Sequence, residues 1–282
     1  MTMTLFHAAS RDALATAEQK LLEVLSAKPA ARAKSVSAEQ LGDELLSVVR
    51  LLDGEIGLRR VLGDSSAEPE RRASLLTELL SGKVSKQALT VLTAAVGERW
   101  STPRELTDGL DVLGRTALLV HAEQGGRLDA VEDELFRFGR IVAADSELER
   151  ALSDRTAPAA SKATLVRELL GEKADSVTLR LVDQLVTVPR GRTVVGGLGE
   201  LAAEAAKRRE RSVATVVAPV PLTEQQEERL AATLQRIYSR PIALHVEVDP
   251  EIQGGLVIKV GDEVIDGSAI GRIDELRRRL AG

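Results

Sequence analysis

An internal repeat of about ninety residues limits the folds open to this chain. Residues 40–100 align without a gap on residues 130–190. Two unrelated amphipathic helices in phase could match at apolar positions, but here charged residues also recur. These charged residues are Asp43, Glu44, Arg50, Arg60, Asp64, Glu78 and Lys83, each with the same residue type 90 positions later. A repeat this long exceeds the ~20–50 residues of a solenoid unit, so it predicts two similar helical bundles in tandem.

The repeat divides the helical part of the chain into two expected domains, 1–105 and 106–211. The boundary falls at residues 101–104, where Pro103 favours a helix start. Apolar residues at helical spacing predict a helix over 5–24 and another from about Ala38, with a polar connector over 26–37 between them. Because aromatic residues make up only 2 % of the chain, we expect aliphatic cores.

The character of the sequence changes after residue 211, which predicts a third, α/β domain over 212–282. Residues 213–218 are β-branched and suit a strand, and Thr223 with Gln226 forms a capping box that starts a helix to about Tyr238. Residues 242–248 alternate as a half-buried strand. Strands over 256–260 and 264–265 form a hairpin across Gly261 and Asp262, and Ser268 is placed to cap a last helix. The expected fold is therefore mainly α: two tandem helical bundles followed by a small C-terminal α/β unit that contains a β-hairpin.

Composition and spacing exclude several functional classes. The formal net charge of −5 gives no global basic field for nucleic acid, and the lack of cysteine leaves no disulfide or thiolate metal site. His7, His121 and His245 are scattered without metal-ligand spacing. No window approaches ~18 uninterrupted apolar residues, and the first thirty residues lack the apolar run of a signal peptide. We expect no catalytic residue, no cofactor, no metal, no nucleic acid partner and no direct membrane span.

Two local features allow more than one interpretation. Gly197, Gly199 and Ala202 form a G-x-G-x-x-A pattern typical of a dinucleotide-binding turn. The preceding Val194 and Val195 are too few for a central strand, so a glycine-rich helix start is favoured, and a nucleotide-binding enzyme is the competing hypothesis. The single tryptophan, Trp100, is expected in a core, with an interface anchor as the alternative.

One ungapped block near the C-terminus carries a family resemblance. Residues 248–268, continuing over 271–276, resemble the C-terminal signature of the delta subunit of bacterial F-type ATP synthase, whose mitochondrial counterpart is the oligomycin-sensitivity-conferring protein. The preceding residues 213–223 look like the family's entry to the same domain, and residues 191–192 match its Gly-Arg pair. The signature residues are Asp249, Gly254, Gly255, Gly261, Asp262, Asp266, Gly267, Ser268, Gly271 and Arg272.

The resemblance implies a function and leaves one question open. Residues from 109 onward fit the usual delta chain, and the first hundred look like an extra copy of the helical domain, as in the longer actinobacterial delta subunits. A protein of this family would be a non-catalytic peripheral-stalk subunit at the cytoplasmic face of the bacterial cell membrane. It would bind alpha subunit N-termini through a helical bundle and the b subunit through its C-terminal domain. Which bundle faces the head stays open, and a helical scaffold unrelated to ATP synthesis is a further alternative.

Overall fold

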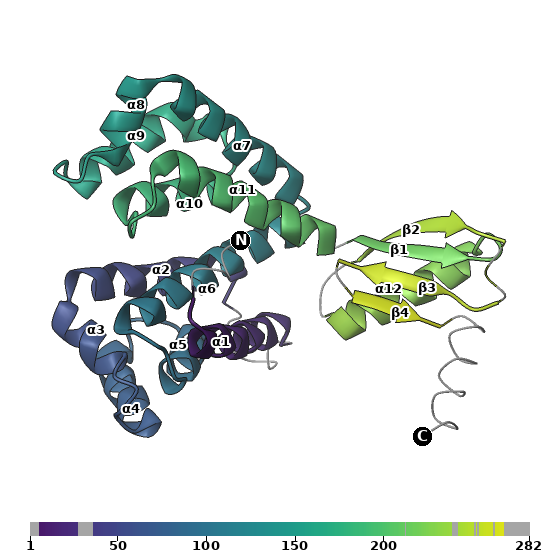
Figure 1. Cartoon of the computed structure of the whole chain (residues 1–282), viewed down its shortest axis with the longest axis horizontal. Helices are drawn as coiled ribbons and strands as arrows, with labels where there is room; N and C mark the ends of the chain where they lie inside the picture. The colour runs from purple at the N-terminus through teal and green to yellow at the C-terminus, as the bar shows by residue number, and fades with distance from the viewer. Residues whose placement is uncertain are drawn as a thin grey trace. The chain divides into compact units, whose positions relative to one another are not determined.

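The computed structural model describes residues 6–27, 36–211, 213–238, 242–250, 252, 254–261 and 263–267. The chain forms two compact units, residues 1–205 and residues 206–282. The first unit is helical, and the second contains a small sheet (Figure 1). The predicted fold class, mainly α with a small C-terminal α/β part, is confirmed.

The helices of the first unit largely follow the predicted pattern. They are α1 (Ala8–Ser26), α2 (Ala38–Gly54), α3 (Ile56–Leu62), α4 (Pro69–Leu80), α5 (Lys86–Gly97), α6 (Pro103–Gln124), α7 (Leu128–Ala144), α8 (Ser146–Ser153), α9 (Ala159–Leu170), the 3₁₀ turn η2 (Gly171–Lys173), α10 (Ser176–Thr187) and α11 (Val194–Arg211), which runs into the second unit. Two details differ from expectation. The first helix begins at Ala8 and not at residue 5, and the stretch from Ala38 is interrupted at Glu55, whose backbone leaves the helical region and starts α3. Most of the predicted connector, residues 28–35, lies outside the described residues.

The repeat reappears as a repeated set of contacts. Glu44 on α2 accepts hydrogen bonds from the backbone N–H and the hydroxyl of Ser85, the N-cap of α5. Ninety residues later, Glu134 on α7 accepts the backbone N–H of Asp175, the N-cap of α10, at 2.9 Å. In both copies the glutamate accepts a hydrogen bond from the N-cap residue 41 positions further along the chain, and so holds the N-terminus of that helix in place. The matched glutamates therefore have the same structural role in both copies.

Two aliphatic cores lie in the first unit, and α6 contributes to both. Its Leu106, Leu110 and Leu113 belong to the first core with α1 to α5. Its Leu118 and Leu119 belong to the second core with α7 to α11. Pro103 occupies the first turn of α6, as predicted, so the expected boundary at residues 105 and 106 falls at the beginning of this helix.

Trp100 lies in the first core, as expected. Its indole N–H donates to the carbonyl of Ala95 at 2.8 Å, and its ring is 6.3 Å from that of Phe6. The ring also fills the space where Gly109 of α6 has no side chain, so a Cβ there would overlap the indole. The tryptophan thus fixes α6 against the first bundle.

The second unit is a four-stranded mixed sheet with one helix described on it. Its elements are β1 (Val213–Ala218), α12 (Glu224–Tyr238), β2 (Ala243–Val248), β3 (Val257–Val260) and β4 (Glu263–Asp266), in the sheet order β2-β1-β3-β4. β1 and β2 are parallel, and β3 pairs antiparallel with both β1 and β4. The capping box is confirmed, because Gln226 accepts from the backbone N–H of Thr223 at 2.8 Å and donates its own N–H to the threonine hydroxyl.

Candidate functional site

The described signature residues build the connections of the second unit. Asp249 directly follows β2, and its N–H donates to the carbonyl of Ala218 at 2.8 Å. Gly261 has φ of +58° in the two-residue turn between β3 and β4, the left-handed conformation predicted for it. The predicted hairpin is confirmed, but its second strand is longer than expected, Glu263–Asp266.

The other signature residues are divided between the β3–β4 hairpin and the undescribed end of the chain. Gly254 and Gly255 have φ of +76° and +85° before β3, and the Gly267 N–H donates to the carbonyl of Leu256 at 2.9 Å. Asp266 pairs with Val257 across the hairpin. Asp262, Ser268, Gly271 and Arg272, together with the expected last helix, lie outside the described residues. The described part of the signature therefore sets the backbone geometry of these connections.

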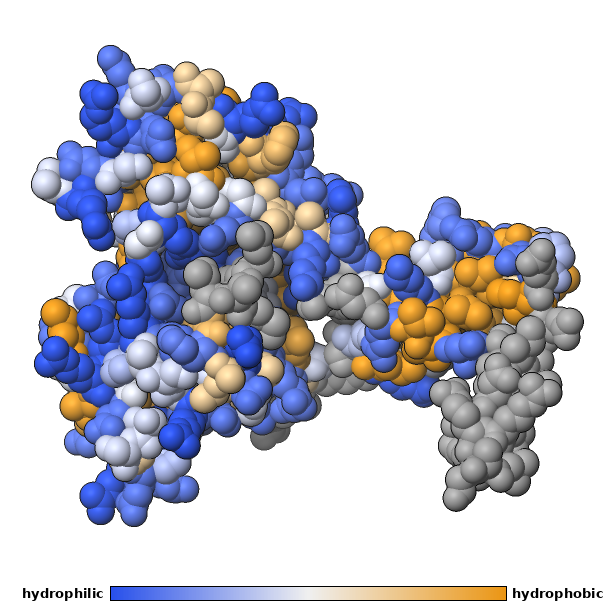
Figure 2. Space-filling view, in the orientation of Figure 1, coloured by the Kyte–Doolittle hydropathy of each residue, from blue (hydrophilic) through white to orange (hydrophobic). Residues whose placement is uncertain are grey.

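The second unit presents a cluster of valines on one sheet face and a mainly apolar cavity. The buried residues of β1 face α12, so the strand register places Val217, Val257 and Val264 together on the opposite face. The polar Thr215, Lys259 and Asp266 share this face. Figure 2 shows hydrophobic surface over the sheet. Val264 is 58 % exposed there. Between the start of α12 and the end of β1 lies a cavity of about 440 Å³. Its lining is mainly apolar and includes Val220, which is 63 % exposed, with Gln226, Arg229 and Thr233 of α12 among it. Both surfaces are suited to an apolar partner.

The two bundles of the first unit meet along α2 and α6, where two glycines allow a close approach. A Cβ added at Gly42 would lie 2.8 Å from Leu118 Cγ, and one added at Gly114 would lie 2.6 Å from Leu46 Cδ2. Leu46, although part of the first copy, belongs to the second core. Val188 of the second copy belongs in turn to the first core. The two copies are therefore packed into one another along this seam.

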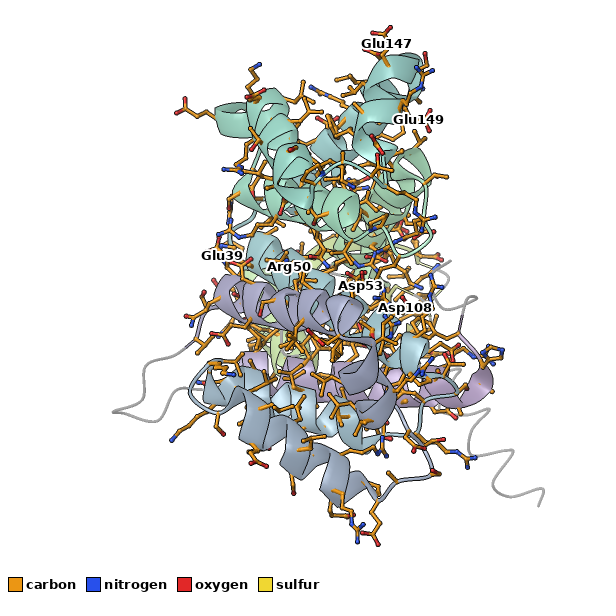
Figure 3. The ribbon with its side chains drawn as sticks, turned by 90° about the vertical axis from the view of Figure 1, so that its left-hand side faces the viewer. Glu39, Arg50, Asp53, Asp108, Glu147 and Glu149 are labelled. Carbon is orange, nitrogen blue, oxygen red and sulfur yellow. The ribbon has the colours of Figure 1, made fainter. Side chains whose placement is uncertain are left out.

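Charged side chains of α2 extend the seam to α10 and the loop after it. Arg180 pairs with Glu39 at 3.1 Å and with Asp43 at 3.0 Å. Arg50 donates to the side-chain carbonyl of Gln184 at 2.7 Å. Figure 3 shows Glu39 and Arg50 along the upper edge of α2, facing the second bundle. These contacts give the seam a polar border around its apolar centre.

A buried ionic network lies beneath this border on α6. Asp111 accepts from Arg192 at 2.9 Å and from Gln184 at 3.1 Å, and it pairs with Arg115 at 3.4 Å. Burial alone would raise the pKa of Asp111, but the charges of Arg115 and Arg192 and the hydrogen bonds outweigh it and lower that pKa below its usual value. Arg115, itself buried, also pairs with Glu204 at 3.3 Å. Burial alone would lower the pKa of Arg115, and the carboxylates around it raise it instead.

Sequence reasoning missed this network, although it uses the matched Gly-Arg pair. Gly191 has φ of +86° and turns the chain so that Arg192 reaches Asp111. In the sequence, Asp111 and Arg115 stand four residues apart among Leu110, Val112, Leu113 and Ala117, a spacing that puts the acid and the base on one face of a helix. That combination at Asp111 and Arg115 was the signal that could have found the network.

The G-x-G-x-x-A pattern lies within α11 and not in a strand–turn–helix. The helix begins at Val194, as the glycine-rich helix start predicts. At Gly197 a Cβ would overlap the side chain of Leu185, so this glycine allows α11 to pack closely on α10. In the part of the chain that the structure describes, no group of three or more His, Asp or Glu residues is placed to hold a metal ion. No helix in that part is long and apolar enough to cross a membrane.

Comparisons with known proteins connect these features to one family. Residues 116–280 match the sequence model described as ATP synthase delta (OSCP) subunit. A protein of Streptomyces griseus named ATP synthase subunit delta is 47 % identical over 276 residues, which cover 98 % of this chain and 100 % of that protein. A protein of Nocardia farcinica with the same name is 47 % identical over the same shares of both chains. One from Thermobifida fusca is 48 % identical over 88 % of this chain and 92 % of that protein. The family model begins within α6, whereas the full-length relatives also match the first bundle.

Proposed function

The chain belongs to the ATP synthase delta (OSCP) subunit family, and from this membership we propose that it is a non-catalytic subunit of the peripheral stalk of a proton-translocating F-type ATP synthase. The observation that carries the proposal is the match over 98 % of the chain to proteins named ATP synthase subunit delta. Through the complex, the chain would lie at the cytoplasmic face of the bacterial cell membrane as a peripheral protein.

The packing of the first unit supports such a role. A stalk that holds the catalytic head against the torque of the rotor must not yield between its points of attachment. Here the two bundles share α6 and exchange Leu46 and Val188 between their cores. Attachment at several points of one chain raises the effective concentration of each further contact without tighter single contacts. The chain would therefore act as a stiff adaptor.

We assign the two proposed partners to separate units. An N-terminal helix of an alpha subunit would bind an apolar helix face of the first unit, as amphipathic helices do. Both bundles expose such side chains: Phe136 on α7 is 58 % exposed and Leu22 on α1 is 38 % exposed. The b subunit would bind the second unit, at the valine face of the sheet or at the cavity beside Val220.

Co-purification tests the role as a whole. A tagged copy of the chain, expressed in its native host, is expected to bring down the alpha, beta and b subunits from solubilised membranes. An untagged strain serves as the control for adventitious membrane proteins. Recovery of the chain without alpha, beta and b would contradict the proposal and favour a scaffold unrelated to ATP synthesis.

The alpha contact is best tested on the full chain. A cut at residue 105 would remove Leu106, Leu110 and Leu113 from the first core, so a loss of binding by that fragment would have no clear meaning. We expect an alpha N-terminal peptide to bind the wild type. Either Phe136→Ala or Leu22→Ala should weaken binding by about thirtyfold or more, the change that about 2 kcal/mol at an interface hot spot produces. Equal affinity of the wild type and both variants would exclude these helix faces.

The b contact is tested in the same way on the second unit. Val264→Glu places a charge on the sheet face, and Val220→Glu places one at the rim of the apolar cavity. One of these variants should lose most of its affinity for the b subunit while binding the alpha peptide unchanged. Unchanged b binding by both variants would show that neither surface is the site.

A further inference from the structure

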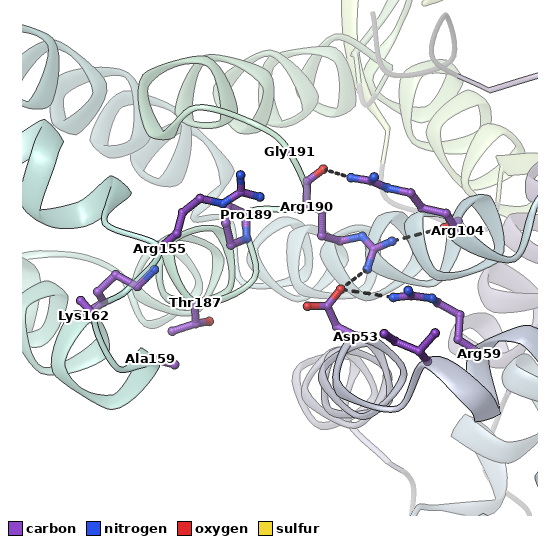
Figure 4. A pocket seen from close by; sticks show the side chains of 12 residues that line it. Asp53, Arg59, Arg104, Arg155, Ala159, Lys162, Thr187, Pro189, Arg190 and Gly191 are labelled. Atoms are coloured by element: carbon purple, nitrogen blue, oxygen red, sulfur yellow. Dashed lines mark hydrogen bonds and ion pairs between the residues drawn. The ribbon is translucent and has the colours of Figure 1, made fainter.

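A cationic cavity lies in the first unit, beside the seam between the bundles. Its volume is about 520 Å³ (Figure 4). Five basic residues line it, and one carboxylate, that of Asp53, lines it with them. The basic residues are Arg59, Arg104, Arg155, Lys162 and Arg190. Such an excess of positive charge in one concave site is the usual mark of an anion-binding site.

One wall of the cavity is held in place by the protein itself. Arg190 pairs with Asp53 at 3.1 Å and with Asp108, and its side chain is only 3 % exposed. Arg104 donates to the carbonyl of Arg190 at 3.0 Å, and Arg59 lies 3.7 Å from Asp53. Two carboxylates, Asp53 and Asp108, thus face the three guanidinium groups of this wall and leave it with a net positive charge.

The opposite wall contains Lys162 and Arg155 (Figure 4). Lys162 is only 6 % exposed, yet no hydrogen bond or ion pair engages its ammonium group within the described residues. Asp154 acts on it electrostatically, but that carboxylate accepts hydrogen bonds from the backbone and hydroxyl of Thr156 at 2.7 Å. The side chain of Lys162 is thus largely enclosed, and its ammonium group is left to the cavity that it lines, where an anion could pair with it.

The internal repeat shows that this arrangement is particular to the second copy. The position equivalent to Lys162 in the first copy is Arg72, which is also buried. Arg72 donates to the carbonyls of Val96, Gly97 and Glu98 at the end of α5, the last two at 3.3 and 3.1 Å. The terminal nitrogens of the cation in the first copy are therefore engaged by backbone carbonyls, whereas the cation of the second copy lines the cavity.

We propose that this cavity binds a phosphate-bearing polyanion with the size and charge of pyrophosphate, which bridges Lys162 and Arg155 on one wall to Arg59 and Arg104 on the other. A single carboxylate would neutralise only one of the surplus cations, whereas linked phosphates supply several charges and several acceptor oxygens. Guanidinium groups match phosphate oxygens in pairs, and a lysine adds a point charge. The bound anion would connect α9 of the second bundle to α3 and α6, and so add a link across the seam.

The test is calorimetric titration of the full-length chain with pyrophosphate. We expect binding by the wild type that weakens as salt is added, because the contacts are ionic. Lys162→Met and Arg155→Ala should each weaken affinity at least about tenfold, the effect of one lost charge-assisted hydrogen bond. Arg155 is exposed, so its variant does not depend on refolding of a core. Lys86→Met, which removes an exposed lysine of α5 outside the cavity, should bind as the wild type does.

Three results would overturn the proposal. The first is no binding of pyrophosphate at millimolar concentration in low salt. The second is equal binding by the wild type, Lys162→Met and Arg155→Ala, which would place the anion elsewhere. The third is binding of a polyglutamate peptide but not of pyrophosphate, which would identify the cavity as a site for an acidic protein segment. None of these results depends on the proposed stalk role.

Discussion

Replacing Asp111 by asparagine removes the charge at the centre of the buried network but keeps the shape of the side chain. In the native chain this carboxylate balances Arg115 at 3.4 Å and Arg192 at 2.9 Å. After the replacement, Arg115 keeps the ion pair with Glu204 at 3.3 Å and the weaker charge interactions with Glu200 and Asp108, although it is almost fully buried. The variant therefore removes one of the carboxylates that balance a buried guanidinium group.

The expected cost follows from that burial. Removing one partner of a buried ion pair typically costs about 3–5 kcal/mol, because the remaining charge is uncompensated. The amide oxygen of asparagine can still accept a hydrogen bond from Arg192 or Gln184, so we expect a loss near the lower end, about 3 kcal/mol. Domains are stable by only about 5–15 kcal/mol, and the loss is thus a large fraction of the total.

The assay is urea unfolding followed by circular dichroism, with a matched control on α7. Asp133 and Arg137 have the same four-residue spacing as Asp111 and Arg115 and pair at 2.7 Å, but both side chains are at least half exposed. Asp133→Asn should cost less than about 1 kcal/mol, because exposed ion pairs contribute little. If Asp111→Asn costs no more than Asp133→Asn, the reasoning from burial is wrong.

Three further outcomes follow from the same structure. The pKa of Asp111 is lowered in the folded chain, so its contribution to stability is present above the unfolded pKa of about 3.9 and is lost as pH falls through the folded pKa. In acid titrations the difference in unfolding free energy between the wild type and Asp111→Asn should therefore disappear at low pH. A difference that does not depend on pH would contradict this. Gly114→Ala should destabilise the chain by about 1–3 kcal/mol in urea unfolding, because the new Cβ overlaps Leu46. Gly199→Ala has open space around it and should stabilise α11 by about 0.5–1 kcal/mol. Equal changes in unfolding free energy for the two variants would rule out the close approach at the seam. Gly261→Val should cost the second unit more than about 1 kcal/mol, measured by thermal unfolding, since φ there is +58°, and an unchanged melting temperature would rule out the turn.

Local chemistry in the sequence predicted local structure well. Pro103 at the start of α6, the capping box of Thr223 and Gln226, and the positive φ of Gly261 each depend on residues within a few positions of one another. The repeat predicted more than periodicity alone could, because matched glutamates such as Glu44 indicate matched contacts. Sequence features of this kind are read directly from spacing.

The network and the cationic cavity depend instead on residues far apart in the sequence. Asp111 meets Gln184 and Arg192 across 73 and 81 residues, and no periodicity reports such a meeting. Lys162 is preceded by Ala-Ala-Ser and has the surroundings of an exposed helix start, and only the tertiary packing buries it. The shared role of α6 has one counterpart in the sequence, because Leu118 and Leu119 point to other sides of the helix than Leu106, Leu110 and Leu113.

Because α6 contributes side chains to both cores, the number of residues in it determines how the side chains of one core are oriented relative to those of the other. In an α-helix each residue advances the direction of side chains by about 100° and the axis by about 1.5 Å. Deletion of one residue between Leu113 and Leu118 would therefore rotate the leucines of the second core by about 100° relative to those of the first. The bundles cannot drift apart by small insertions in this segment, as domains joined by a loop can. We expect the length of α6, more than its surface, to be fixed among relatives that carry both bundles.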